Sequence, residues 1–179
     1  MAGFYRVNAM KKQFYIFILL IFSSSVAARG TYQEPANFLD EVFNSKPPQS
    51  KVIWLTGSIR TKATEILNHK PTRLRIRYWN NQQRTAWILD EIGKEKPITV
   101  GIVISNNKIE RVKVLVFRES RGDEIRHDFF TQQFKHARLN ANNNQLDRSI
   151  DGISGATLSV RALTKLTRLA LFLSTQIKQ

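Results

Sequence analysis

The sequence of 179 residues contains no cysteine. Without thiols the chain can form no disulfide, bind no iron–sulfur cluster through cysteine and attach no c-type haem. Any redox chemistry of this protein must therefore use a bound organic cofactor. Acidic residues are also few, because 14 Asp and Glu stand against 28 Lys and Arg and give a formal net charge of +14.

The basic residues are scattered along the chain and form no dense run. A strongly positive balance often favours nucleic-acid binding, but this distribution and the export signal described next argue against it. The charge can instead attract acidic redox partners or the anionic surface of a membrane, or only keep the protein soluble. We therefore expect no nucleic-acid partner and at most a peripheral contact with a membrane.

The first residues have the pattern of a secretory signal peptide. Lys11 and Lys12 precede an apolar run at 14–22, and small residues follow up to Ala28. The apolar run is too short to span a bilayer as a stable anchor, and no cysteine follows it for attachment of a lipid. We expect cleavage after Ala28, or after Ala27, and a periplasmic location; an uncleaved anchor is the alternative.

The remaining sequence divides into an N-terminal helical arm at 29–70 and a domain at 71–179. In the arm, Pro35 and the apolar residues after it predict one short helix, and 59–68 predicts a second. The apolar run 52–55 between them is too short to assign to a helix or a strand.

The hydrophobic period changes to two after Pro71, which predicts strands at 74–78, 85–89, 98–104 and 109–117. Asn106 and Asn107 tolerate positive φ and favour a tight hairpin turn between the last two strands. Because both of these strands have apolar residues on both faces, we expect them at the centre of the sheet. Short connections throughout predict an antiparallel sheet of about four to five strands.

Helices are predicted to cover this sheet. Residues 127–137 form one, with Phe129, Phe130 and Phe134 expected to pack on the sheet, and residues 157–177 form the last, with one apolar side. The expected fold class is therefore α+β, in which the chain ends with the helix that follows a Ser-Gly-Ala-Thr loop.

The most informative segment is Asp151-Gly152-Ile153-Ser154-Gly155-Ala156-Thr157, directly before the last helix. A helix N-terminus has unpaired backbone N–H groups and the positive end of the helix dipole, so it suits a phosphate. Gly155 permits close approach of the backbone or a positive φ, and Thr157 places a hydroxyl beside that phosphate. The alternative is an ordinary helix start in which Ser154 caps the first turn.

This segment resembles the flavinylation motif D-x-x-(S/T)-G-A-T of the FMN-binding domain, a family found in subunits of the sodium-translocating NADH:quinone reductase and of the Rnf electron-transport complex. The resemblance implies that Thr157 carries FMN covalently through a phosphoester bond, made by a periplasmic flavin transferase with FAD as donor. It also implies that this enzyme recognises Asp151 and Gly155. Ser154, Ala156 and Leu158 are expected to line the turn. Ser159 is expected to add a hydrogen bond to the phosphate.

The resemblance covers about residues 71–179 and includes the segment after the strand at 109–117. There, Glu119, Ser120 and Arg121 are candidates for contacts with the flavin ring, and Gly122 would allow close approach. A plain charged turn is the alternative interpretation of these four residues.

Aromatic and histidine side chains give weaker signals. Three aromatic residues can stack on a flavin or simply belong to the core: Trp79, Trp87 and Phe117. The three histidines show no spacing typical of a metal site, and we expect them to be lone surface side chains: His69, His127 and His136.

Together these observations predict a small exported FMN-carrying electron-transfer protein. No acid–base constellation is visible, so an electron carrier is favoured over a stand-alone enzyme. Its expected partners are the flavin transferase and redox proteins such as cytochromes or a membrane electron donor. Two alternatives are a flavin-dependent reductase with its own substrate, and a non-redox periplasmic binding module in which Thr157 only starts a helix.

Overall fold

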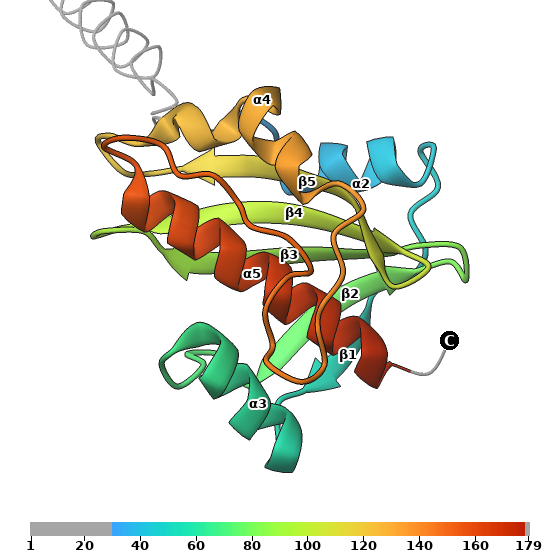
Figure 1. The fold of residues 1–179 in the computed structure, drawn as a ribbon. Coiled ribbons are helices and arrows are strands. Elements are labelled where there is room, and N and C mark those ends of the chain that lie inside the picture. The colour runs from blue at the N-terminus through green and yellow to red at the C-terminus, as the bar shows by residue number, and fades with distance from the viewer. Residues whose placement is uncertain (1–29, 178–179) are drawn as a thin grey trace, which may run out of the picture.

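The computed structural model describes residues 30–177, which form one five-stranded sheet with helices on both faces (Figure 1). The predicted α+β fold class is thereby confirmed. The predicted signal peptide at 1–28 lies outside the described residues. Within residues 30–177 no helix has the length and apolar character that crossing a bilayer requires.

The strands lie in the sheet in the order in which they occur in the chain, and every neighbouring pair is antiparallel. The apolar run at 52–55, which the sequence did not assign to a helix or a strand, lies mainly in an edge strand. Asn106 and Asn107 both have positive φ, as the hairpin between the last two strands requires. The strands are β1 (Lys51–Trp54), β2 (Arg75–Asn80), β3 (Thr85–Ile92), β4 (Pro97–Ser105) and β5 (Lys108–Phe117).

The prediction that residues 109–117 form a central strand is wrong, because β5 is the last strand of the sheet. Its apolar residues on both faces have another cause. Other segments pair with its outer edge: Tyr32 N–H donates to the Leu115 carbonyl, and His136 N–H donates to the Ile109 carbonyl. Strand β5 is therefore enclosed although it ends the sheet.

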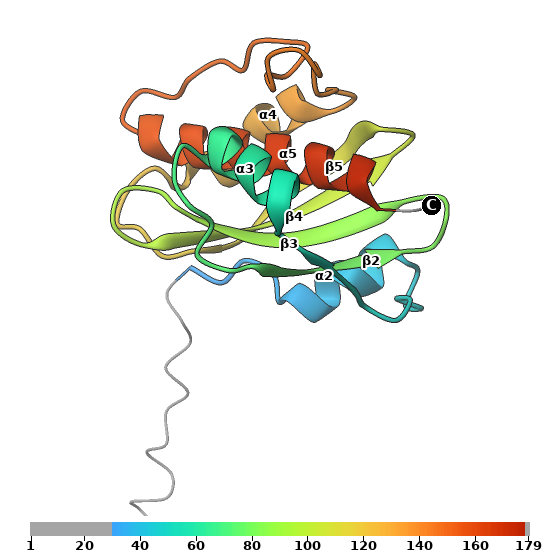
Figure 2. The same cartoon turned by 90° about the horizontal axis from the view of Figure 1, so that it is seen from below.

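Helices enclose the sheet from both sides (Figure 2). Helix α5 (Thr157–Gln176) and helix α3 (Gly57–Leu67) lie on one face, and helix α2 (Pro35–Val42) lies on the other. The described part of the predicted arm, residues 30–70, therefore contributes two helices and strand β1 to the same fold as the residues that follow. The larger core lies between the sheet and helices α3 and α5.

Helix α2 packs closely on the opposite face. A Cβ atom on Gly101 of β4 would lie 2.6 Å from the ring of Phe38, so only glycine leaves room for this ring. The ring is completely buried, together with apolar side chains of β3, β4 and β5. Trp79 of β2 and Ile88 of β3 are partly buried against this smaller core.

The predicted single helix at 127–137 is wrong in its extent. The segment contains short pieces: η1 (Asp123–Arg126), α4 (Asp128–Thr131) and η2 (Gln132–Phe134). Extended backbone at His127 separates the first two, and pairing of residues 136–137 with Ile109 pulls the chain out of a helical path. Phe130 and Phe134 are buried as predicted, but Phe129 is 64% exposed and does not pack on the sheet.

Candidate functional site

The predicted phosphate-binding segment forms the turn that leads into helix α5. The turn is closed by a hydrogen bond of 3.0 Å from Ala156 N–H to the Ile153 carbonyl, and Thr157 is the first residue of the helix. Gly155 has a φ of +80°, a conformation that costs other residues energy. A Cβ atom there would meet no atom within 4 Å, so the space beside the turn is open.

The start of helix α5 has no side-chain cap. Its N-cap residue is Ala156, which has no side-chain oxygen, so the alternative of an ordinary start capped by Ser154 is wrong. Among residues 30–177 no acceptor bonds the N–H groups of Thr157, Leu158 and Ser159. These donors lie at the positive end of a helix of 20 residues, which suits an anionic group.

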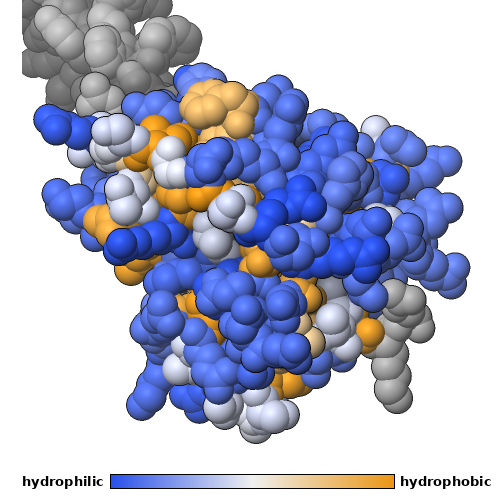
Figure 3. All heavy atoms as spheres, in the orientation of Figure 1, coloured by the Kyte–Doolittle hydropathy of each residue, from blue (hydrophilic) through white to orange (hydrophobic). Residues whose placement is uncertain are grey.

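The turn has an outer and an inner side. Thr157 and Ser154 are exposed, and Leu158 is 42% exposed, whereas Ala156 and Ser159 are buried. The hydroxyl of Thr157 is therefore open to a reaction partner, and the Ser159 side chain faces the protein. Figure 3 shows apolar surface gathered near α4 and this end of α5, on a face that is otherwise mainly hydrophilic.

The structure brings the segment after β5 directly against this turn. A Cβ atom on Gly122 would lie 2.9 Å from Ser159 Oγ and 3.3 Å from Ala156 Cβ. Gly122 also has a φ of +89°, so both its conformation and its neighbours require glycine. The two segments that the sequence singled out thus form one site.

Glu119 precedes Gly122 in the segment after β5 and connects this segment to the turn between β3 and β4. Its Oε1 atom accepts hydrogen bonds from the backbone N–H groups of Lys94, Glu95 and Lys96 at 2.5, 2.7 and 2.9 Å. Burial opposes ionisation of this carboxyl, but the three N–H groups outweigh burial and hold the pKa of Glu119 below its ordinary value. Glu119 therefore ties the β3–β4 turn to the end of β5. Nothing in the sequence pattern indicated that the loop 93–96 contacts the segment after β5.

Gln133 is a second residue that the sequence did not indicate. Its Oε1 atom accepts the backbone N–H of Asp151 at 2.7 Å and so holds the beginning of the turn. The side chain of Asp151 is exposed, and within residues 30–177 its carboxylate accepts no hydrogen bond. The Asp151 carboxylate therefore faces outward, where another protein can reach it.

The remaining candidates lie on the surface or in the core. Ser120 and Arg121 are exposed beside Gly122. Trp87 and Phe117 belong to the core, with exposures of 0% and 3%, and Trp79 packs with the cluster under helix α2 on the opposite face of the sheet. Residues 30–177 contain no group of His, Asp and Glu side chains that could hold a metal ion.

The interpretation of His69 as a lone surface side chain is wrong. Its Nε2 atom lies 2.9 and 3.1 Å from the carboxylate oxygens of Glu91, which is buried. Lys165 Nζ lies 3.5 Å from the same carboxylate. Hydrogen bonds to the Lys70 carbonyl and to Glu91 outweigh partial burial and raise the pKa of His69.

The residues of the turn fit the phosphate of a flavin nucleotide. Unbonded N–H groups at a helix start and an open glycine supply a place for an anion, and the exposed Thr157 hydroxyl supplies an attachment point. Flavin nucleotides need no thiol from the protein, which agrees with the absence of cysteine.

Comparison with known proteins agrees with this geometry. Residues 93–171 match the family model described as the FMN-binding domain. This span contains β4, β5, the segment 119–122, the turn and most of helix α5. No curated protein and no solved structure matches the chain significantly. On the matched residues and the fold around them, residues 93–171 of this chain form an FMN-binding domain.

Proposed function

We propose that this protein is an exported electron carrier that holds FMN covalently, through a phosphoester to the hydroxyl of Thr157. The observation that carries this proposal is the position of Thr157: exposed, first in helix α5, and behind an open turn whose helix start has no side-chain cap. The family match adds that the domain around this threonine binds FMN.

Attachment requires a second protein. Thr157 Oγ1 forms a bond to the phosphorus of the FMN half of FAD, the bond from that phosphorus to the AMP half breaks, and AMP leaves. The hydroxyl proton passes to a base of the transferase or to water, and no electrons are transferred. Such a reaction needs metal ions and positioned charges. A periplasmic flavin transferase supplies them.

The exposed parts of the turn suit recognition by that enzyme. Asp151 presents its carboxylate outward, and Gly155 leaves the backbone accessible. Gln133 fixes the backbone at Asp151, so the turn is presented in one conformation. The N–H groups of Thr157, Leu158 and Ser159 then donate to the phosphate oxygens after attachment.

When bound, FMN supplies reversible uptake and release of electrons, which no side chain of this chain provides. Glu119 and Gly122 act as positioning residues, because one holds the β3–β4 turn and the other packs under the Thr157 turn. Ser120 and Arg121 are exposed between them and are our candidates for contact with the ring. The exposed site leaves the flavin accessible to a membrane or periplasmic donor and to acceptors such as cytochromes.

Co-expression tests the covalent bond. The full chain is expressed with its signal peptide and a flavin transferase, and denaturing gels are viewed under ultraviolet light. We expect a fluorescent band for the natural chain and for Thr175→Ala, an exposed threonine near the other end of helix α5. Thr157→Ala should lose the band. Absence of fluorescence from the natural chain contradicts the proposal.

Intact mass spectrometry of periplasmic material tests both cleavage of the signal peptide and attachment of FMN. The expected mass is that of the chain from residue 29 onward plus FMN less one water. A chain that keeps residues 1–28 contradicts cleavage of the signal peptide, and a chain with no adduct contradicts attachment. Steady-state assays with added donors and acceptors then separate a carrier from a reductase with its own substrate.

A further inference from the structure

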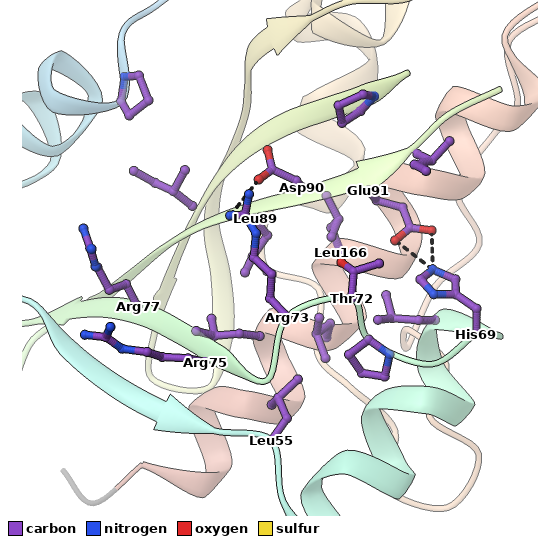
Figure 4. A pocket seen from close by; sticks show the side chains of 18 of the residues that line it. Leu55, His69, Thr72, Arg73, Arg75, Arg77, Leu89, Asp90, Glu91 and Leu166 are labelled. Atoms are coloured by element: carbon purple, nitrogen blue, oxygen red, sulfur yellow. Dashed lines mark hydrogen bonds and ion pairs between the residues drawn. The ribbon is translucent and has the colours of Figure 1, made fainter. Parts of the chain in front are cut away.

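The sheet contains a cleft between β2 and β3. These strands pair only from Tyr78–Trp87 to Asn80–Thr85, whereas β3 and β4 pair over the whole of β3. Beyond Tyr78 the two strands separate, and a groove of about 1000 Å³ opens between them (Figure 4). This volume is at the upper end of the range typical of small-molecule sites, about 300–1,000 Å³.

The floor of the groove is apolar. It is formed by side chains from the end of β1, from helices α3 and α5, and from the two separated strands. None of these side chains carries a polar atom. They are Leu55, Leu67, Ile76, Leu89, Leu166 and Leu169.

The rim is strongly basic. Arg75 and Arg77 are alternate residues of β2, so they lie on the same side of the strand, roughly 6–7 Å apart. Arg73, which precedes the strand, also lines the groove. Arg73 pairs with Asp90 at 3.4 Å. Arg75 and Arg77 are exposed and, within residues 30–177, form no ion pair. Figure 4 shows these two side chains extending from β2, apart from the Arg73–Asp90 pair.

The acids that border the groove are already bonded. Asp90 accepts a hydrogen bond of 2.7 Å from Thr99 Oγ1 in addition to its pair with Arg73. Glu91 is bonded by His69 and lies near Lys165. Among residues 30–177 no acid therefore offsets the repulsion between Arg75 and Arg77, and an anion from outside would relieve it.

We propose that this groove binds an amphipathic organic anion, with its acidic head on Arg75 and Arg77 and its apolar body along the leucine-lined floor. Guanidinium groups bind carboxylates and phosphates through paired hydrogen bonds. An acidic protein surface would use the arginines but could not reach a floor that lies between two strands, so the groove favours a small ligand. The site uses none of the residues of the Thr157 turn and does not depend on the proposed flavin function.

Isothermal titration calorimetry of the purified chain with dodecanoate, below its micelle concentration, tests this proposal. We expect saturable binding of one dodecanoate per chain. Acetate has the head without the apolar body, and dodecyl maltoside has the body without the charge. Both should bind at least roughly tenfold more weakly, because each lacks one of the two interactions. Equal binding of dodecanoate and dodecyl maltoside, or no heat with dodecanoate, overturns the proposal.

Variants locate the site. Arg75→Gln combined with Arg77→Gln should weaken dodecanoate binding by about tenfold or more. The matched control removes the same charge elsewhere, at Arg60 and Arg138, which are exposed and outside the groove. Thr72→Trp should block the groove without a change of charge, because Thr72 is an exposed lining residue and its replacement disturbs no core. An equal loss in the control, or unchanged binding with Thr72→Trp, overturns the assignment.

Discussion

Gly122 packs directly against Ser159, so that a Cβ atom on Gly122 would lie only 2.9 Å from the Ser159 hydroxyl oxygen. One residue follows the last strand, and the other belongs to the first turn of helix α5. Their contact fixes where the Thr157 turn stands relative to the sheet. The site therefore depends on a close approach between two segments that are distant in the sequence.

Replacement of Gly122 by alanine should destabilise this contact. The positive φ alone costs a residue with a Cβ atom about 1–2 kcal/mol, and the new methyl group also meets Ser159 and Ala156. Urea unfolding should show a lower free energy of unfolding. Gly152→Ala is the control, since Gly152 lacks a positive φ and a Cβ atom there would meet no other atom within 4 Å. Equal losses in both variants would contradict this account.

Glu119→Gln should change how stability depends on pH. The folded protein holds the pKa of Glu119 below its ordinary value of 4.5, so the charged form stabilises the fold above that pH. This contribution is lost as the pH falls through the lowered folded pKa. Urea unfolding measured from pH 7 to pH 3 should show a higher free energy of unfolding for the natural chain than for the variant at pH 7. The difference between the two free energies should narrow below about pH 4.5. A constant difference across this range would contradict a role for the carboxylate charge.

The contribution of His69 to stability should depend on pH in the opposite direction. Its pKa is raised above 6.5, so protonated His69 stabilises the fold at low pH, and the contribution is lost as the pH rises through the folded pKa. Glu91→Gln removes one cause of the raised value and should lower the pKa of His69 in an NMR titration. The Lys70 carbonyl still accepts a hydrogen bond from the ring, so part of the shift should persist. An unchanged titration midpoint would show that Glu91 has no influence on His69.

Ser174→Ala should weaken the larger core without removing apolar contacts. Trp87 Nε1–H donates a hydrogen bond of 2.9 Å to Ser174 Oγ, and both side chains are buried. Loss of the acceptor leaves a buried indole N–H unpaired, at a cost of about 1–3 kcal/mol in the free energy of unfolding. Ser58→Ala, an exposed serine in helix α3, should change this free energy by less than about 0.5 kcal/mol. Similar values for the two variants would rule out the buried bond as the cause.

Local pattern in the sequence was sufficient for most of the secondary structure. Alternation of apolar and polar residues located β2, short apolar runs located β3, β4 and β5, Asn106 and Asn107 located a hairpin, and helical spacing located α5. These features depend on the φ/ψ preferences and side-chain directions of neighbouring residues, so they can be predicted from the sequence alone. The turn before Thr157 was visible for the same reason.

Only the tertiary structure decided which segments meet. The contact of Gly122 with Ser159 and the bonds of Glu119 to the loop 94–96 join residues far apart in the chain. The groove beside β2 and β3 is likewise lined by residues as distant as Leu55 and Leu169. The broken helix at 127–137 has the same origin, since pairing with Ile109 overrode local helical spacing. Such contacts depend on the path of the whole chain through the sheet, whereas a local pattern reports only the conformation of its own segment.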